Sequence, residues 1–135
     1  MIVGLTGKVV LVTGAASGIG AAIARLAAAS GPAGLMLTDM DAHGLARTAS
    51  DVAATGAAVA TFLADLASPA APGDIIAAAI ARFGRIDALV NCAGLTTRAA
   101  LTDATPALWE TLFAVNARAP FFLMQAAVRD MLARR

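Results

Sequence analysis

The sequence predicts an α/β fold, a doubly wound parallel sheet of about four strands with helices on both sides, and three observations lead to it. Short apolar runs suited to strands alternate with alanine-rich segments suited to helices, which is the pattern of successive βαβ units. The first apolar run, 9–12, leads directly into the octapeptide Thr13-Gly14-Ala15-Ala16-Ser17-Gly18-Ile19-Gly20, and a second ends in an acid, Asp39. A strand, a glycine turn and a helix in this order bring a polyphosphate close to main-chain N–H groups at the positive end of the helix.

The first two strands and helices have local start and stop signals. Strands are predicted at residues 8–13 and 34–39, and helices at 18–30 and 42–54. Gly31-Pro32 ends the first helix, because glycine commonly follows a helix and proline cannot continue one. Asp39 and Asp41 precede the second helix and Gly56 follows it, and these residue types are typical of helix starts and ends.

The rest of the chain repeats the pattern. Strands are predicted at residues 58–63 and 86–91, and helices at 70–83 and 105–133. Ser68-Pro69 opens the third helix and Gly84 ends it, while Gly73 favours a later start, because an interior glycine costs about 1 kcal/mol relative to alanine. In a doubly wound sheet these strands take the order 3-2-1-4. Residues 1–135 are therefore expected to form a single domain.

Composition and charge exclude several classes of function. Alanine is the largest single part of the hydrophobic fraction of 59%, and polar residues interrupt every apolar stretch before the roughly 18 residues of a membrane span. Ten Lys and Arg residues balance nine Asp and Glu residues, so no basic stripe is available to follow a nucleic-acid backbone. The single cysteine, Cys92, is expected to be a small buried filler, and with one histidine, His43, no metal site is predicted. Because no charged leader precedes an apolar segment, we expect a cytoplasmic protein.

Five motifs, in the right order and spacing, resemble the short-chain dehydrogenases/reductases, and the resemblance covers the chain from Leu5 onward. They are the T-G-x-x-x-G-x-G loop, Asp39 after the second strand, Asp65-Leu66 after the third, Leu89-Val90-Asn91-Cys92-Ala93-Gly94 after the fourth, and Trp109 followed by Val115-Asn116. The resemblance implies a Rossmann-type fold and a nicotinamide dinucleotide as cofactor. It also implies an oxidoreductase that interconverts an alcohol and a carbonyl by hydride transfer.

By resemblance, each motif has a role at the cofactor. The glycine loop would hold the pyrophosphate, through Gly14, Ser17, Gly18, Ile19 and Gly20. Asp39 would bind the adenosine ribose hydroxyls and Asp65 and Leu66 the adenine, above a wall formed by Asn91, Ala93 and Gly94. Asn116 matches the asparagine of the family's catalytic proton relay. Residue chemistry leaves alternatives open, namely Asp39 as a helix N-cap, Asp65 in loop capping and Asn91 in strand-end backbone hydrogen bonds.

The chain departs from the family at the catalytic residues. The family's catalytic serine and Tyr-x-x-x-Lys pair lie beyond the fourth helix, whereas this sequence stops at Arg135, has no tyrosine and has Lys8 as its only lysine. Carbonyl reduction needs a positioned proton donor and alcohol oxidation a base, and the amide of Asn116 can serve as neither. The sequence therefore predicts the dinucleotide-binding portion of such an enzyme, truncated before its catalytic segment and inactive alone.

Two other functions are weighed beside this one. A stand-alone, non-catalytic dinucleotide-binding module is the main alternative, and nothing in the sequence excludes it. A methyltransferase that uses the same glycine loop fits poorly, because 91–94 and Val115-Asn116 would have no role there.

Cofactor preference and partners depend on a few side chains. Where NADP-preferring members of the family place Arg or Lys, this chain has Ser17 and Asp39, so NAD is expected over NADP. The substrate, a small alcohol or carbonyl, stays unidentified. Apolar side chains of the last helix, such as Phe121 and Phe122, and an open strand edge at 86–91 favour a homo-oligomer or self-association.

Overall fold

A computed structural model describes residues 4–134 and confirms the predicted fold class. Its four parallel strands have the order β3-β2-β1-β4, with β1 at Val9–Thr13, β2 at Gly34–Asp39, β3 at Val59–Leu63 and β4 at Ala88–Asn91. β1 pairs with both β2 and β4, so that Val10 lies between Leu35 and Ala88. Sheets of this kind bind ligands beyond the carboxyl ends of their strands, at the point where the strand order reverses.

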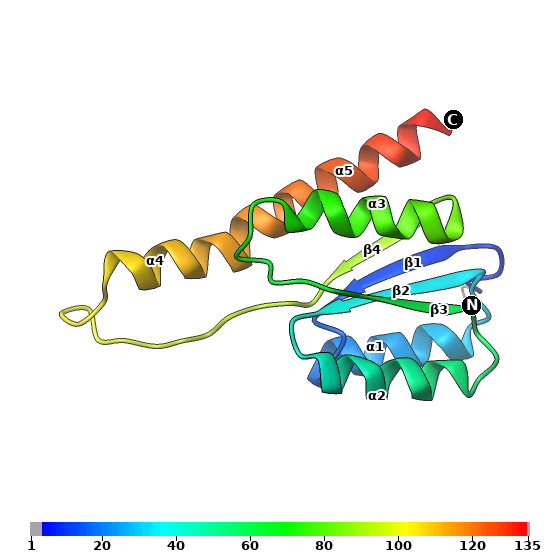
Figure 1. Ribbon diagram of the computed structural model, residues 1–135, viewed down its shortest axis with the longest axis horizontal. Coiled ribbons are helices and arrows are strands. Elements are labelled where there is room, and N and C mark those ends of the chain that lie inside the picture. Colours follow the sequence, from blue (N-terminus) through cyan, green and yellow to red (C-terminus); the bar gives the residue numbers. More distant parts are fainter. Residues whose placement is uncertain (1–3, 135) are drawn as a thin grey trace.

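Helices cover both faces of the sheet (Figure 1). α1 (Gly18–Ala29) and α2 (Ala42–Ala53) lie on one face, and α3 (Ala71–Phe83) and α5 (Ala119–Ala133) on the other. Because both faces are covered, β1 is buried along its entire length, and its first four residues are a continuous apolar run. The consecutive β1 residues Val10 and Leu11 belong to two different hydrophobic cores, one on each face of the sheet. Within residues 4–134, no helix has the length and hydropathy needed to span a membrane.

The predicted boundaries of the strands and of the first three helices lie within two residues of the observed ones. The expectation that the third helix begins after Gly73 is wrong, because α3 already begins at Ala71. Pro72 explains the early start, since its fixed φ suits the first turn of a helix and its missing N–H is not needed there. Gly84 ends α3 in the left-handed conformation, with φ of +78°.

The predicted helix at 105–133 is not a single α-helix. It is divided into α4 (Pro106–Phe113), a π-helical turn η1 (Ala114–Arg118) and α5. The N–H of Ala119 donates to the carbonyl of Ala114, which is the longer hydrogen bond of a π-helix. Pro120 gives a physical reason, because it has no N–H to donate and its ring would clash with the carbonyl four residues before it. α4 extends beyond the carboxyl ends of the strands, at the left of Figure 1.

The predicted strand at 86–91 is shorter in the structure, because β4 begins at Ala88. The N–H of Ile86 donates to the carboxylate of Asp130 in α5, and its carbonyl accepts from the Arg134 guanidinium. Asp87 binds Val9 through both its backbone N–H and its carboxylate. The open strand edge is therefore limited to Ala88–Asn91, since side chains from the end of α5 occupy the backbone groups of Ile86.

Candidate functional site

A cavity of about 650 Å³ lies at the carboxyl ends of the strands. Most of the predicted site residues line it, namely Gly14, Ser17, Gly18, Ile19, Gly20, Asp39, Asp65, Leu66, Ala93 and Gly94. They come from the turn after β1 and from the segments that end or follow the other three strands. The described lining residues include two carboxylates and neither Lys nor Arg, so the donors available to an anionic ligand are main-chain N–H groups and the hydroxyls of Ser17, Thr38 and Thr111.

The glycine turn has positions at which only glycine fits the backbone. Gly14 and Gly18 have φ of +67° and +53°, a region that other residues rarely adopt. A Cβ on Gly14 would lie 2.7 Å from the nitrogen of Ala93, and one on Gly20 would overlap the carbonyl oxygen of Gly14. A Cβ on Gly18 would meet no atom within 4 Å, so this residue borders open space. The turn therefore fits a polyphosphate at the N-terminus of α1.

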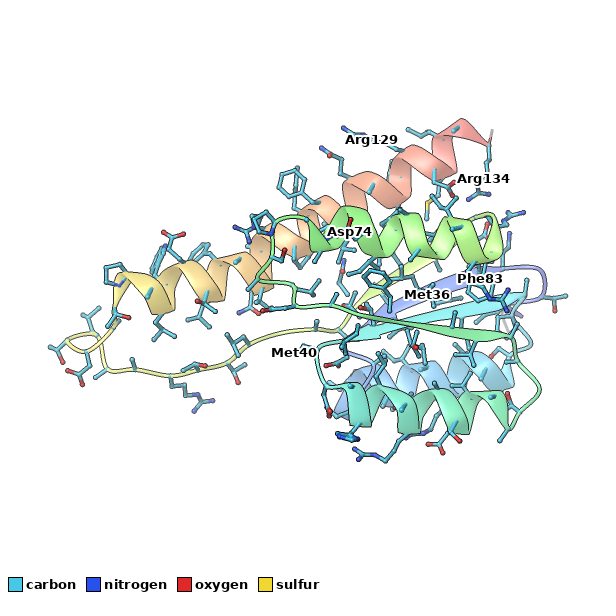
Figure 2. The ribbon with its side chains drawn as sticks, in the orientation of Figure 1. Met36, Met40, Asp74, Phe83, Arg129 and Arg134 are labelled. Atoms are coloured by element: carbon cyan, nitrogen blue, oxygen red, sulfur yellow. The ribbon has the colours of Figure 1, made fainter. Side chains whose placement is uncertain are left out.

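Asp39 connects the glycine turn to the start of α2. Its Oδ2 accepts from the N–H of Ala16 and its Oδ1 from the N–H of Asp41, both at 3.0 Å. The N-cap of α2 is Asp41, whose Oδ1 accepts from the N–H groups of His43 and Gly44. The alternative that Asp39 is a helix cap is therefore wrong. The Asp39 side chain is held at the cavity, which the exposed Met40 also lines (Met40 is labelled in Figure 2).

The loop after β3, residues 64–68, forms a turn and also lines the cavity. Asp65 Oδ1 accepts from the N–H of Ala67 at 2.8 Å, and its carbonyl accepts from the N–H of Ser68 at 3.0 Å. The loop interpretation of Asp65 is therefore correct for one carboxylate oxygen, although the residue also lines the cavity. Leu66 is buried and packs against the core on the α3 and α5 face.

The loop after β4, residues 92–95, is attached to β1 by Thr13. The Oγ1 of this buried threonine accepts from the N–H groups of Cys92 and Ala93, both at 3.1 Å. Cys92 is half-buried and lines the cavity, so its interpretation as a buried filler is wrong. Asn91 is exposed and does not line the cavity, because a side chain at a strand end faces whichever side the strand's pleat gives it.

Asn116, in the middle of η1, also binds the loop after β4. Its Oδ1 accepts from the N–H of Leu95 and its Nδ2 donates to the carbonyl of Leu95, both at 2.8 Å. The amide is therefore engaged in both directions with one backbone unit, outside the lining of the cavity. The sequence identified this asparagine but not its role in holding a loop.

Several other lining residues were not predicted from the sequence. They are Thr38, Met40, Ala64, Ala67, Leu95, Thr111 and Val115. Most of them are sequence neighbours of motif residues, and this adjacency could have identified them as lining residues. Thr111 and Val115 could not be identified in this way, because their positions depend on how α4 and η1 lie beside the cavity. Thr38 is 1% exposed and its hydroxyl has no hydrogen-bond partner in the described part of the chain, so it offers a free polar group beside the cavity. Among residues 4–134, no group of His, Cys, Asp or Glu could hold a metal ion.

Comparison with known proteins identifies relatives over nearly the whole chain. The family model for short chain dehydrogenases matches residues 8–135. D-threitol dehydrogenase from Mycolicibacterium smegmatis is 40% identical over 128 residues, which are 95% of this chain and 49% of the relative. The chain thus spans about half the length of the curated relatives that it matches.

Solved structures give the same result for the fold. A metagenomic short-chain oxidoreductase in complex with NADP is 37% identical with a TM-score of 0.90, covering 96% of this chain and 59% of that protein. A 3-oxoacyl (acyl-carrier-protein) reductase from Agrobacterium tumefaciens with NADP bound is 33% identical with a TM-score of 0.89, covering 97% and 50%. These structures support a nicotinamide dinucleotide as the cofactor, but they hold NADP and give no support to a preference for NAD.

Proposed function

Because the chain belongs to the short-chain dehydrogenase family, we propose that it is the dinucleotide-binding portion of an oxidoreductase that interconverts an alcohol and a carbonyl. The observation that carries this proposal is the cavity at the strand ends, where the open glycine turn, the N-terminus of α1 and Asp39 meet. The dinucleotide, when bound, supplies the hydride chemistry, while the chain supplies binding and orientation.

In this proposal each segment of the cavity binds one part of the dinucleotide. Main-chain N–H groups of the glycine turn hold the pyrophosphate, where Ser17 leaves the first turn of α1 without a side-chain cap. Asp39 accepts hydrogen bonds from the adenosine ribose, and Asp65 and Leu66 contact the adenine. Ala93 and Gly94 form the wall beneath that ribose, with Asn91 supporting them from the end of β4. Asn116 keeps the position of the family's relay asparagine.

We further propose that the chain prefers NAD to NADP. The two N–H groups bound by Asp39 fix its carboxylate beside the glycine turn, and each oxygen keeps capacity to accept from a ribose hydroxyl. A 2′-phosphate at this position would meet a like charge, with neither Lys nor Arg among the lining residues to pair with it. The preference would distinguish this chain from relatives whose structures hold NADP.

Calorimetric titration of the 135-residue chain with both dinucleotides tests the proposal. We expect NAD to bind at least about tenfold more tightly than NADP, a difference of about 1.4 kcal/mol. Asp39→Asn removes the charge and should bring the NAD and NADP affinities closer together, whereas Asp74→Asn, at an exposed position in the first turn of α3, should leave their ratio unchanged. Equal or reversed affinities would refute the preference for NAD, and binding of neither dinucleotide would refute the proposed function.

One observation favours a second function, dinucleotide binding without turnover. The only lysine, Lys8, is exposed and precedes β1, at the end of the strand opposite to the cavity, and the sequence has no tyrosine. We therefore expect the 135-residue chain to transfer no hydride to or from a panel of alcohols and carbonyls, followed by the absorbance of reduced nicotinamide. Turnover above background would contradict this expectation. Activity in a longer form that carries a Tyr-x-x-x-Lys pair would instead favour the oxidoreductase.

A further inference from the structure

The π turn η1 is hydrogen-bonded to two loops of the cavity. Asn116 binds both backbone groups of Leu95, in the loop after β4. Two residues later, the Nη2 of Arg118 donates to the carbonyl oxygen of Ala67, in the loop after β3, at 2.5 Å. The Arg118 side chain is partly buried and connects residues that are 51 positions apart in the sequence. One helical turn therefore holds loops that follow two different strands.

The other hydrogen bonds of the loop after β3 are made within the loop, to the strand beside it, or at its far end to α3, where the carbonyl of Ser68 accepts from the N–H of Ala71 at 3.3 Å. The N–H of Ala64 donates to the carbonyl of Asp39, and Asp65 accepts from the N–H groups of Ala67 and Ser68. These bonds shape the turn and attach its first residue to β2. The Arg118 bond attaches the middle of the loop to η1, and its charged donor makes it stronger than a bond between neutral groups.

We propose that Arg118 is a positioning residue for adenine recognition, because it holds the loop after β3 so that Asp65 remains at the cavity. This inference rests on the proposed function, in which Asp65 and Leu66 contact the adenine. Arg118 is not a lining residue of the cavity and acts through the carbonyl of Ala67. Asn116 and Arg118 lie two residues apart in η1 and bind different loops of the cavity.

Titration with two dinucleotides tests this role. NAD and nicotinamide hypoxanthine dinucleotide differ at the adenine amino group, which an oxygen replaces in the second. If Asp65 accepts from that amino group, the wild-type chain should prefer NAD by about tenfold, the effect of one hydrogen bond to a charged group. Arg118→Met keeps the apolar length of the side chain and should lower this preference to within about twofold of unity. Arg118→Lys keeps the charge and should give an intermediate ratio.

Matched controls separate positioning from general stability. Arg129→Met removes an exposed arginine of α5 that points away from the sheet (Figure 2) and should retain the wild-type preference. Asp65→Asn should lower the preference as Arg118→Met does, and the double variant should lose little more, because both changes affect one contact. An unchanged preference in Arg118→Met, or no preference in the wild-type chain, would overturn the positioning role.

Amide hydrogen exchange gives a readout that needs no dinucleotide. Exchange at Ala67 and Ser68 should be faster in Arg118→Met than in the wild-type chain, and unchanged in Arg129→Met. If the wild-type chain bound neither dinucleotide, the proposed function would fail, and exchange would still decide whether Arg118 holds the loop. Faster exchange would then support the anchoring, and unchanged exchange would overturn it.

Discussion

Gly18 and Gly31 form a matched pair for testing the glycine turn. Their φ values are +53° and +67°, and a Cβ on either residue would meet no atom within 4 Å. Valine at either position should therefore lower stability by a similar amount, about 1–2 kcal/mol for the left-handed conformation. Of the two, Gly18 lines the cavity. We expect Gly18→Val to abolish dinucleotide binding with helix content largely intact, and Gly31→Val to bind as the wild-type chain does.

For the two variants, urea unfolding measures stability, circular dichroism measures helix content, and calorimetric titration measures dinucleotide affinity. Equal dinucleotide affinity in Gly18→Val and Gly31→Val would show that the glycine turn does not hold the ligand.

The site residues that could be predicted from the sequence are those whose geometry is local. The spacing of Gly14, Gly18 and Gly20 determines a turn, and an acid at the end of a strand lies at the ligand edge of the sheet. The position of Asn91 relative to the cavity could not be predicted, because the direction of its side chain depends on the pleat of β4. Arg118 could not be found, since its partner is a backbone carbonyl 51 residues away and no local pattern marks such a pair.

At the level of elements, four charged side chains join the end of α5 to the start of β4. Arg134 pairs with Asp130 at 3.0 Å and lies 3.6 Å from Asp87, which Arg85 binds at 2.5 Å. Burial raises the pKa of Asp87, but hydrogen bonds from Arg85 and from the N–H of Val9 outweigh it, and the pKa lies below its ordinary value. Folding therefore favours the ionised carboxylate.

The pH dependence of this contribution has a definite sign. The stabilisation is present above the ordinary pKa of 3.8 and is lost as the pH falls through that value toward the lower pKa of the folded state. The stability difference between the wild-type chain and Asp87→Asn should therefore shrink as the pH falls from about 6 to about 3, measured by urea unfolding.

Asp51→Asn is the control for this prediction. It removes an exposed ion pair with Arg25, which should contribute about 0–1 kcal/mol, so its loss should have a small effect at every pH. A difference between wild type and Asp87→Asn that grows in acid would contradict the assignment of the carboxylate.

The elements of the first 100 residues could be predicted closely because each begins and ends at residues with strong local preferences, such as Gly84 after α3. The segment 105–133 could not. Pro120 indicates that a regular helix is disturbed there, but a kink, a break and a π turn are all compatible with a proline. Asn116 and Arg118 both lie in the π turn and bind two different loops, and these contacts are tertiary.

For the whole molecule, the main unpartnered surface lies along α4 and α5. Large apolar side chains are exposed there, with Trp109 at 60%, Phe113 at 50%, Phe121 at 56% and Phe122 at 44%. Their exposure shows that they are not core residues in the described chain. Trp109 and Phe113 stack on each other, with ring centroids 4.4 Å apart, and shield little of this surface.

We expect the 135-residue chain to self-associate through this surface. Clusters of exposed apolar side chains favour association, and the open edge of β4 adds unpaired backbone groups. Size-exclusion chromatography with light scattering at micromolar concentration should show dimers or larger species. Phe121→Ser should shift them toward the monomer, whereas Leu26→Ser, which removes an exposed leucine of α1, should not. A sharply melting monomer of the wild-type chain would contradict this prediction.

The central position of β1 also has a kinetic consequence. The turn after β1 contacts the end of β2 across 23 residues, whereas the start of β1 contacts Asp87, just before β4, across 78. Closing the longer loop costs about 1 kcal/mol more in chain entropy, so β1, α1 and β2 should assemble before β4 and α5 add to them. Ala24→Gly in α1 should therefore mainly slow refolding, and Leu123→Ala in α5 should mainly speed unfolding, in stopped-flow measurements. The opposite pattern would place the nucleus on the α5 side of the sheet.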